Sequence, residues 1–151
     1  MELIIRNAVA DDAAAVAAIE KACFSAPWSE RQIEEEIGKD NALFFVAETD
    51  GAVCGYVSAE DISGECYMNN LAVAQSFRGH GTGRQLMRQL IDAARLRGCA
   101  FLTLEVREGN APARHIYETC GFSLAGVRKN FYDAPQENAF IYTLYFKEEQ
   151  P

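Results

Sequence analysis

A stretch rich in glycine and arginine, SFRGHGTGRQLM at residues 76–87, precedes apolar residues with helical spacing. The N-terminus of a helix carries partial positive charge and normally attracts Asp or Glu into its first turn. Here Arg78, Arg84 and Arg88 crowd that end instead, and the first carboxylate is that of Asp92. A glycine-rich turn at a helix N-terminus presents free backbone N–H groups, so the stretch predicts an anion site. The alternative is a flexible surface turn with incidental arginines.

The spacing of this turn distinguishes it from two common phosphate-binding motifs. The pattern Arg78-x-x-Gly81-x-Gly83 lacks the Lys and the Ser or Thr of a P-loop. It also differs from the G-x-G-x-x-G of dinucleotide-binding folds. The turn alone therefore leaves the choice between anion site and surface turn open.

A single carboxylate interrupts the apolar segment FLTLEV at residues 101–106, which is expected to form a strand. Glu105 shares one face of that strand with Phe101 and Thr103, because side chains alternate with a period of two. If the strand is central, the carboxylate is partly shielded from water, which favours a role as general base, directly or through water. The alternatives are an exposed face of an edge strand and a salt bridge.

The elements that must position these residues follow from periodicity and from turn signals such as Asp50-Gly51 and Ser63-Gly64. Strands are expected at residues 3–8, 42–49, 53–60, 65–73, 101–106, 122–130 and 139–146. Helices are expected from Asp11-Asp12 to Cys23 and at residues 30–37, 81–97 and 110–120. Gly38, Gly98 and Gly121 would end the last three helices, and Asn110 would cap the fourth.

The order of these elements predicts the fold class. The three strands from residues 42 to 73 follow one another through tight turns and should be antiparallel. The helix at residues 81–97 joins two strands by a β-α-β crossover, so those two strands should be parallel. We therefore expect an α/β fold with a mixed, largely antiparallel sheet of about seven strands, about four helices and a central parallel pair. The length of 151 residues suits a single domain, 1–151.

Composition limits the kinds of partner and site. The 14 basic and 22 acidic residues give a net charge of −8, which argues against direct binding of nucleic acid and is compatible with a basic protein or an amine as substrate. Five cysteines without a C-x-x-C spacing and two histidines indicate reduced thiols rather than a metal site or disulfides. Neither a secretory signal nor a membrane-spanning segment is recognisable, so we expect a cytoplasmic protein with no membrane partner.

In the order of its elements, nearly the whole chain resembles the GCN5-related N-acetyltransferases, whose acetyl-CoA signature is Q/R-x-x-G-x-G/A after a strand. It is more similar still to the bacterial ribosomal-protein-alanine N-acetyltransferases. The segments that carry this closer resemblance are APWSE (26–30), NLAV (70–73), LEVREGN (104–110), IYETCGF (116–122) and RKNFY (128–132).

The resemblance implies that the anion is the pyrophosphate of acetyl-CoA, used as co-substrate without a metal. The residues implied to wrap it are Arg78, Gly79, His80, Gly81, Thr82, Gly83 and Arg84. Backbone groups of Leu71, Ala72 and Val73 would bind the pantetheine arm, because that strand splays from its parallel neighbour. Asn110 would bind the cofactor from the other side.

The resemblance also implies roles for two side chains. A protonated amine cannot attack a thioester, and an α-amino group has a pKa of about 7.7–8.0, so only a modest base is needed. Glu105 would be that base, and Tyr117 would donate a proton to the departing thiolate. Without the resemblance, Tyr117 is more simply a core aromatic. Backbone N–H groups near residues 71–73 would hold the oxyanion, and no covalent enzyme intermediate is needed.

Three functions remain open. The first is acetylation of a protein N-terminus, the N-terminal alanine of a ribosomal protein; the second is acetylation of a small amine; the third is a non-catalytic acetyl-CoA sensor or interaction module. Glu137-Asn138 stands where the resembling family usually has Glu-Asp, which puts peptide specificity in doubt. Whether Trp28 and residues 130–138 line the acceptor groove is open, as is the oligomeric state.

Overall fold

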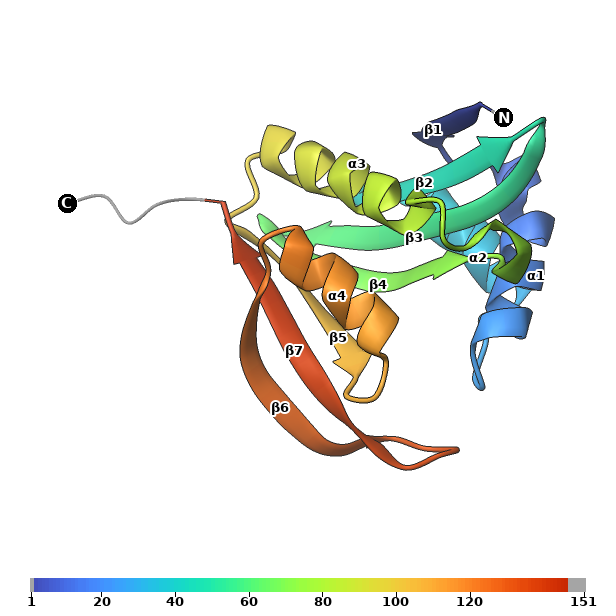
Figure 1. The fold of residues 1–151 in the computed structure, drawn as a ribbon. Coiled ribbons are helices and arrows are strands. Elements are labelled where there is room, and N and C mark those ends of the chain that lie inside the picture. The colour runs from blue at the N-terminus through green and yellow to red at the C-terminus, as the bar shows by residue number, and fades with distance from the viewer. Residues whose placement is uncertain (1, 147–151) are drawn as a thin grey trace.

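The computed structural model describes residues 2–146. Its strands form one seven-stranded sheet in the order β1-β2-β3-β4-β5-β7-β6 (Figure 1). The strands are β1 (Leu3–Asn7), β2 (Ala42–Thr49), β3 (Ala52–Ile62), β4 (Glu65–Val73), β5 (Phe101–Arg107), β6 (Ser123–Tyr132) and β7 (Glu137–Tyr145). Neighbouring strands are antiparallel except β4 and β5, which are parallel. The mixed sheet with a central parallel pair is thus confirmed.

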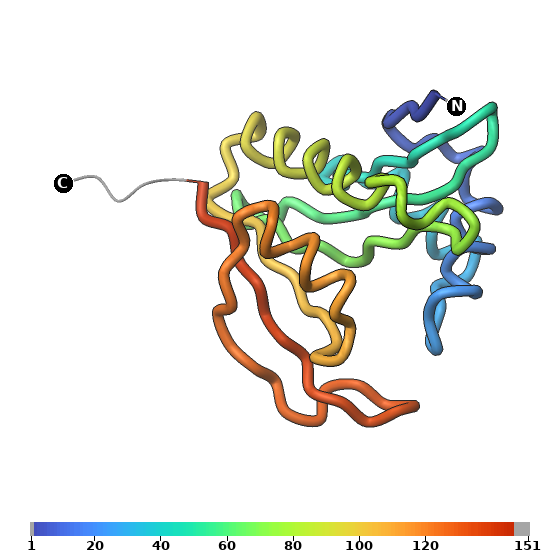
Figure 2. Tube along the Cα trace, viewed as in Figure 1, coloured from blue at the N-terminus to red at the C-terminus, as the bar shows by residue number. Residues whose placement is uncertain are grey.

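Four helices cover the sheet: α1 (Ala13–Cys23), α2 (Glu30–Ile37), α3 (Thr82–Leu96) and α4 (Ala111–Thr119). The helices α1 and α2 pack on one face of the β2–β4 region, while α3 packs on the other face of β1–β5, with α4 beside it. In the trace of Figure 2 the blue N-terminal helices lie on the right and the body of the orange-red C-terminal hairpin on the left, with the hairpin turn reaching back below the helices. Each face of the sheet therefore has its own hydrophobic cluster.

The predicted elements all occur, and the differences lie at their ends. The first helix was expected to open at Asp11-Asp12, but residues 10–12 form a separate 3-10 turn and α1 begins at Ala13. Asp12 is used there as an anchor: it accepts the N–H of Val9 at 2.8 Å and forms a salt bridge with Arg6 at 2.9 Å. The strand β3 also continues to Ile62, two residues beyond its predicted end.

A bulge in β4 changes which side chains face which helix layer. Ser58 of β3 pairs with Asn70, but the next pair is Ala59 with Met68, so Asn69 is an extra residue. Without the bulge, Met68 and Asn70 would point to the same face. With it, Met68 lies in the cluster under α3, whereas Ala72, on the face of Asn70, lies in the cluster under α1.

The parallel pair is short. Pairing of β4 with β5 covers only residues 65–67 with residues 101–103. Beyond these residues the two strands part, which confirms the splay expected from the family resemblance. The gap opens where β4 carries residues 70–73 and β5 carries Glu105. Within the described residues, no helix is long and apolar enough to cross a membrane.

Candidate active site

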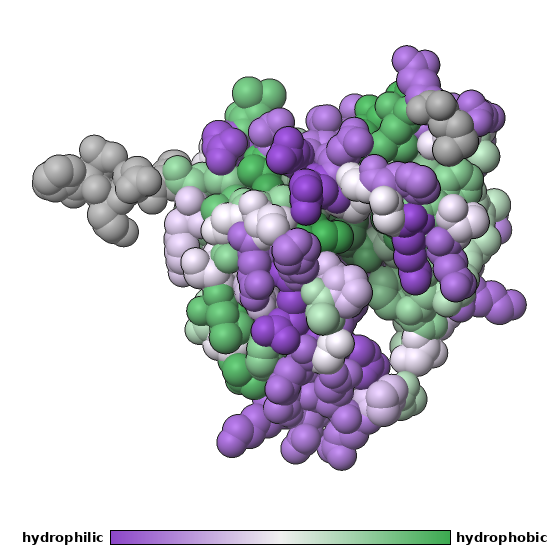
Figure 3. All heavy atoms as spheres, in the orientation of Figure 1, coloured by the Kyte–Doolittle hydropathy of each residue, from purple (hydrophilic) through white to green (hydrophobic). Residues whose placement is uncertain are grey.

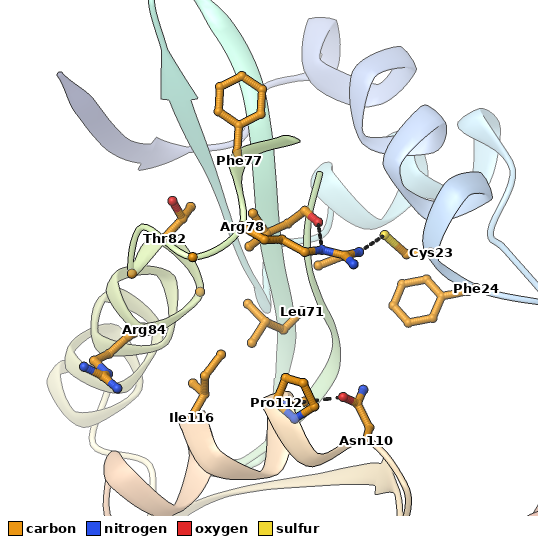
Figure 4. A pocket seen from close by; sticks show the side chains of 16 residues that line it. Cys23, Phe24, Leu71, Phe77, Arg78, Thr82, Arg84, Asn110, Pro112 and Ile116 are labelled. Carbon is orange, nitrogen blue, oxygen red and sulfur yellow. Dashed lines mark hydrogen bonds between the residues drawn. The ribbon is translucent and has the colours of Figure 1, made fainter. Parts of the chain in front are cut away.

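Two cavities meet at the gap between β4 and β5. The larger has a volume of about 690 Å³ and lies between the start of α3, the start of α4 and the C-terminal end of β4 (Figure 4). The smaller, of about 430 Å³, lies beside Glu105 and Tyr117. Figure 3 shows the hollow between the two halves of the molecule, with hydrophobic atoms in its depth and hydrophilic residues on its rim. The residues that line both cavities are Cys23, Phe24, Leu71, Asn110 and Ala113.

The glycine-rich turn forms one end of the larger cavity. Gly79 and Gly81 have φ angles of 85° and 80°, a conformation that other residues adopt only with strain. Gly81 is also the N-cap of α3, whose first turn contains no acidic residue. A Cβ atom on Gly83 would lie 3.0 Å from Ile116 Cδ1, so glycine allows α3 and α4 to approach closely. The turn therefore presents the free N–H groups of α3 to the cavity, as a phosphate site requires.

The side chain of Arg78 makes two contacts within the protein. Its Nε donates to the carbonyl of Val73 at 2.9 Å, and its Nη2 lies 3.3 Å from the Sγ of Cys23, so the side chain reaches across the larger cavity (Figure 4). Two groups expected to bind the cofactor, Arg78 and the Val73 backbone, are thus bonded to each other. This bond uses one of the five N–H groups of the guanidinium, so the others remain for a ligand.

The remaining predicted cofactor residues, except His80, line the larger cavity. Thr82 and Arg84 line the larger cavity, together with the predicted glycines and the backbone of residues 71–73. Asn110 caps α4 through Oδ1, which accepts the N–H of Ala113 at 3.3 Å, so the predicted cap is confirmed and Nδ2 is left for a ligand. His80 is exposed and is not among the lining residues of either cavity.

Glu105 lies in the smaller cavity with a third of its side chain exposed (33%). Its Oε2 is 2.6 Å from Nε of Arg128 in β6, so the salt bridge that the sequence left open is present. The N–H of Arg128 is not directed at the oxygen, and this buried Oε2 has no hydrogen-bond partner within the described residues. Because Oε2 is buried, a water molecule or an amine can reach this carboxylate only through its other oxygen, Oε1.

Tyr117 reaches the same cavity from α4. It is almost fully buried and packs against Phe122 and Tyr142, with ring centroids 6.0 and 6.2 Å away. Burial, with smaller contributions from Tyr132 and Cys120, raises the pKa of its phenol well above the usual value. The hydroxyl is therefore protonated near neutral pH and can donate. It has no side-chain hydrogen bond in the part of the chain that the structure describes.

Two walls enclose the smaller cavity, and the sequence alone did not establish that either segment lines it. One is the loop after α1, through Phe24, Ser25 and Ala26; the other is the β6–β7 turn, through Tyr132, Ala134 and Pro135. Residues 130–138 thus contribute to the groove, whereas Trp28 packs in the cluster under α1 and α2 and is not among the residues that line it.

Arg107 holds the second wall in place. Its guanidinium stacks 4.4 Å from the ring centre of Tyr132, donates to the carbonyls of Asp133 and Pro135 at 2.9 Å, and pairs with Glu137 at 3.2 Å. Sequence reasoning missed Arg107, Arg128 and Asn70 as site residues. The signal for Asn70 was a polar pair, Asn69-Asn70, inside an otherwise apolar strand. The two arginines act through contacts distant in sequence, which local patterns do not contain.

A sequence model of the Acetyltransferase (GNAT) family matches residues 13–122, which include the glycine-rich turn, Glu105 and Tyr117. The chain belongs to this acetyltransferase family, which confirms the enzyme class expected from the sequence.

Among the similar proteins is the [ribosomal protein bS18]-alanine N-acetyltransferase of Escherichia coli K12, which is 34% identical over 83% of this chain and 86% of its own. The crystal structure of the ribosomal-protein-S18-alanine N-acetyltransferase from Escherichia coli superposes with a TM-score of 0.90 at 30% identity, covering 99% of this chain and 97% of that one. An acetyltransferase of Salmonella typhimurium, solved with acetyl-CoA, shares the fold with a TM-score of 0.85 at 22% identity, covering 100% and 98% of the two chains.

Proposed function

We propose that the protein transfers the acetyl group of acetyl-CoA to the α-amino group of a protein N-terminus, that of the ribosomal protein bS18, in the cytoplasm. The observation that carries this proposal is the meeting of two cavities between the parted strands. One cavity ends in an anion cradle, and the other holds a carboxylate and a phenol. A donor and an acceptor entering from opposite sides would meet at Glu105 and Tyr117.

The larger cavity fits the cofactor. The N–H groups at the start of α3 would hold the pyrophosphate, and Arg78 and Arg84 would balance its charge. The backbone of residues 71–73 lies open toward the gap and would pair with the amide groups of the pantetheine arm. Nδ2 of Asn110 would bind that arm from the side of α4. When bound, acetyl-CoA supplies an activated acetyl thioester.

Glu105 acts on the acceptor amine. Its Oε1, the oxygen not paired with Arg128, accepts a proton from the amine, directly or through one water molecule, so that the nitrogen lone pair is free for attack. Since an α-amine has a pKa of about 7.7–8.0, a carboxylate is a sufficient acceptor when proton removal accompanies attack. The salt bridge with Arg128 fixes the position of this carboxylate.

Tyr117 acts on the leaving group. Its neutral hydroxyl donates a proton, or a hydrogen bond, to the sulfur as the thiolate departs. The packing of its ring between Phe122 and Tyr142 holds the phenol at the edge of the smaller cavity. Backbone N–H groups of β4 near the gap would stabilise negative charge on the acetyl oxygen.

Two observations favour a protein N-terminus over a small amine. The smaller cavity lies between two extended walls, the loop after α1 and the β6–β7 turn, which leaves room for a chain to continue beyond the reacting amine. The Escherichia coli relative at 34% identity is named for acetylating the alanine of ribosomal protein bS18. The side chains of Glu137 and Asn138 form hydrogen bonds within the protein. Glu137 accepts from Gly109 and Arg107, while Asn138 donates to Glu108 and accepts from the N–H of Asn130.

The test is an acceptor panel with the purified protein and acetyl-CoA. The panel contains a peptide with the N-terminal sequence of the host's bS18, the same peptide with a blocked α-amine and an added lysine, and small polyamines and amino sugars. We expect acetylation of the first alone, located on the α-amine by fragmentation mass spectrometry. Turnover of small amines without turnover of the peptide would contradict the proposed acceptor.

A further inference from the structure

A buried carboxylate lies behind the acceptor cavity and lines neither cavity. Glu20 of α1 is only 1% exposed. It accepts three hydrogen bonds from three other parts of the fold: from the backbone N–H of Trp28 at 2.8 Å, from Nδ2 of Asn70 at 2.8 Å, and from the hydroxyl of Tyr56. A carboxylate buried at this depth is costly unless its oxygens are satisfied, so these bonds fix the positions of their donors.

The three partners of Glu20 are neutral donors. No salt bridge in the described part of the chain includes Glu20, and burial together with its charge raises the pKa of the Tyr56 phenol, which therefore stays protonated. A carboxylate can only accept, so every group that faces it must present N–H or O–H. This requirement determines the orientation of the Asn70 side chain.

The carboxamide of Asn70 has an oxygen that accepts and an NH2 group that donates, and Glu20 determines which of the two faces it. The β4 bulge at Asn69 turns Asn70 toward α1, where Nδ2 faces Glu20. Oδ1 is then the end left over, and it accepts no side-chain hydrogen bond within residues 2–146. Asn70 also lines the smaller cavity together with Glu105, and its Oδ1 is the carboxamide end that Glu20 does not use.

Glu20 also fixes one of the two walls of that cavity, the loop after α1. Its bond to the N–H of Trp28 closes the loop that begins after α1, and Phe24, Ser25 and Ala26 of this loop line the cavity. The capping box of Ser29 with Gln32 follows directly and starts α2. One side chain therefore ties the loop after α1, one wall of the groove, to Asn70 of β4.

We propose that Oδ1 of Asn70 binds an N–H of the acceptor's N-terminal residue, and that Glu20 is the positioning residue that points this oxygen into the groove. The inference rests on the proposed function and adds the group that recognises the amine. Once Glu105 has taken the proton that frees the lone pair, the neutral amine still has two N–H bonds. Asn70 holds one of them, and the proton of the other leaves as the amide forms, replacing the one that Tyr117 gives to the thiolate. Because the Asn70 oxygen has no charge, it binds the amine without competing for its proton.

The test compares three variants with the wild type on the bS18 peptide: Glu20→Gln, Asn70→Ala and the control Glu36→Gln. Gln at position 20 keeps the shape but turns one acceptor into a donor, so Asn70 loses its fixed orientation. Glu36 is equally a buried glutamate, bonded to Lys39 in a position away from both cavities. The readouts are kcat, KM for peptide, acetyl-CoA affinity by calorimetry, and Tm.

We expect Glu20→Gln and Asn70→Ala each to raise KM for the peptide about five- to tenfold, the effect of one lost hydrogen bond, with unchanged acetyl-CoA affinity. Glu36→Gln should leave KM unchanged, whatever its effect on Tm. If Glu20 is merely structural, its variant lowers Tm and leaves KM unchanged, which overturns the inference. If Glu20→Gln does not fold, Asn70→Ala decides alone. A wild type inactive on the peptide overturns the proposed function instead.

Discussion

Glu105 and Tyr117 approach the same cavity from different elements, and their surroundings differ. The carboxylate is paired with Arg128 and is partly open to solvent, whereas the phenol is enclosed by aromatic rings and remains neutral. A proton acceptor and a proton donor are thus available together near neutral pH. The roles assigned to them can be separated by substitutions that conserve shape.

Replacing Glu105 with Gln should lower turnover about 10²–10⁴-fold near neutral pH, because the amide cannot accept the amine proton. The loss should shrink as the pH rises above the pKa of the α-amine, where the acceptor is already neutral. Steady-state rates over a pH series measure this. Acetyl-CoA affinity should be unchanged, since Glu105 lines only the smaller cavity. Full turnover of the variant at neutral pH would show that Glu105 is held for its ion pair alone.

Replacing Tyr117 with Phe removes only the hydroxyl and keeps the ring packed against Phe122 and Tyr142. We expect lower turnover with little change in Tm or in cofactor affinity. The effect should be smaller than for a poor leaving group, because a thiol has a pKa of about 8.5. Tyr117→Ala is the contrasting variant and should lower Tm by opening a cavity. Wild-type turnover of the Phe variant, with chemistry rate-limiting, would refute the proton-donor role.

At the scale of elements, the start of α3 is the feature on which cofactor binding depends. Gly81→Asp should abolish acetyl-CoA binding, since it places a strained residue and a negative charge where the phosphate would lie. Gly51→Asp is a matched control: Gly51 has the same φ of 80° and open space around it, but lies in the β2–β3 turn. Calorimetry should find binding in the control alone. Unchanged affinity in folded Gly81→Asp would remove the basis for the cofactor site.

The sequence predicted the order and type of the elements because their signals are local. Asp50-Gly51 and Ser63-Gly64 sit at turns with positive φ, and Asn110 caps α4 within its own turn. The bulge at Asn69 was not predicted, because it shows only in the register against β3. The pairing of Glu105 with Arg128, and of Arg78 with Val73 and Cys23, also depends on tertiary folding. The residue types at the site were therefore predictable, but their partners were not.

At the scale of the molecule, the ion pairs of Arg6 connect the edge of the sheet to the turn before α1 and make stability depend on pH. The guanidinium of Arg6, and next the N–H of Val9, lower the pKa of Asp12 below its usual value of 3.8. A lowered pKa in the folded state adds stability that is complete above the unfolded pKa and is lost as the pH falls through the folded one.

Asp12→Asn should therefore lower the free energy of unfolding at pH 7 by about 1.5–3 kcal/mol, the range for hydrogen bonds to charged groups. The difference from wild type should shrink as the pH falls below about 4, where the Asp12 carboxyl of the unfolded wild-type chain begins to be protonated, and should vanish below the lowered pKa of the folded state. Urea unfolding at both pH values measures this. Asp92→Asn is the control, because the Asp92–Arg95 pair is exposed and 3.7 Å apart. An equal loss in both variants would contradict the assignment.

The parting of β4 from β5 has a consequence for hydrogen exchange. Backbone amides in the middle of a seven-stranded sheet ordinarily exchange slowly, because each is bonded to a neighbouring strand. Those of residues 71–73 and 104–106 that point into the gap lack such a strand, since pairing stops at Tyr67 and Thr103. They should take up deuterium at rates typical of loops. A cofactor chain lying in the gap would act as the missing strand, so the slowing of exchange at the centre of the sheet would report its occupancy.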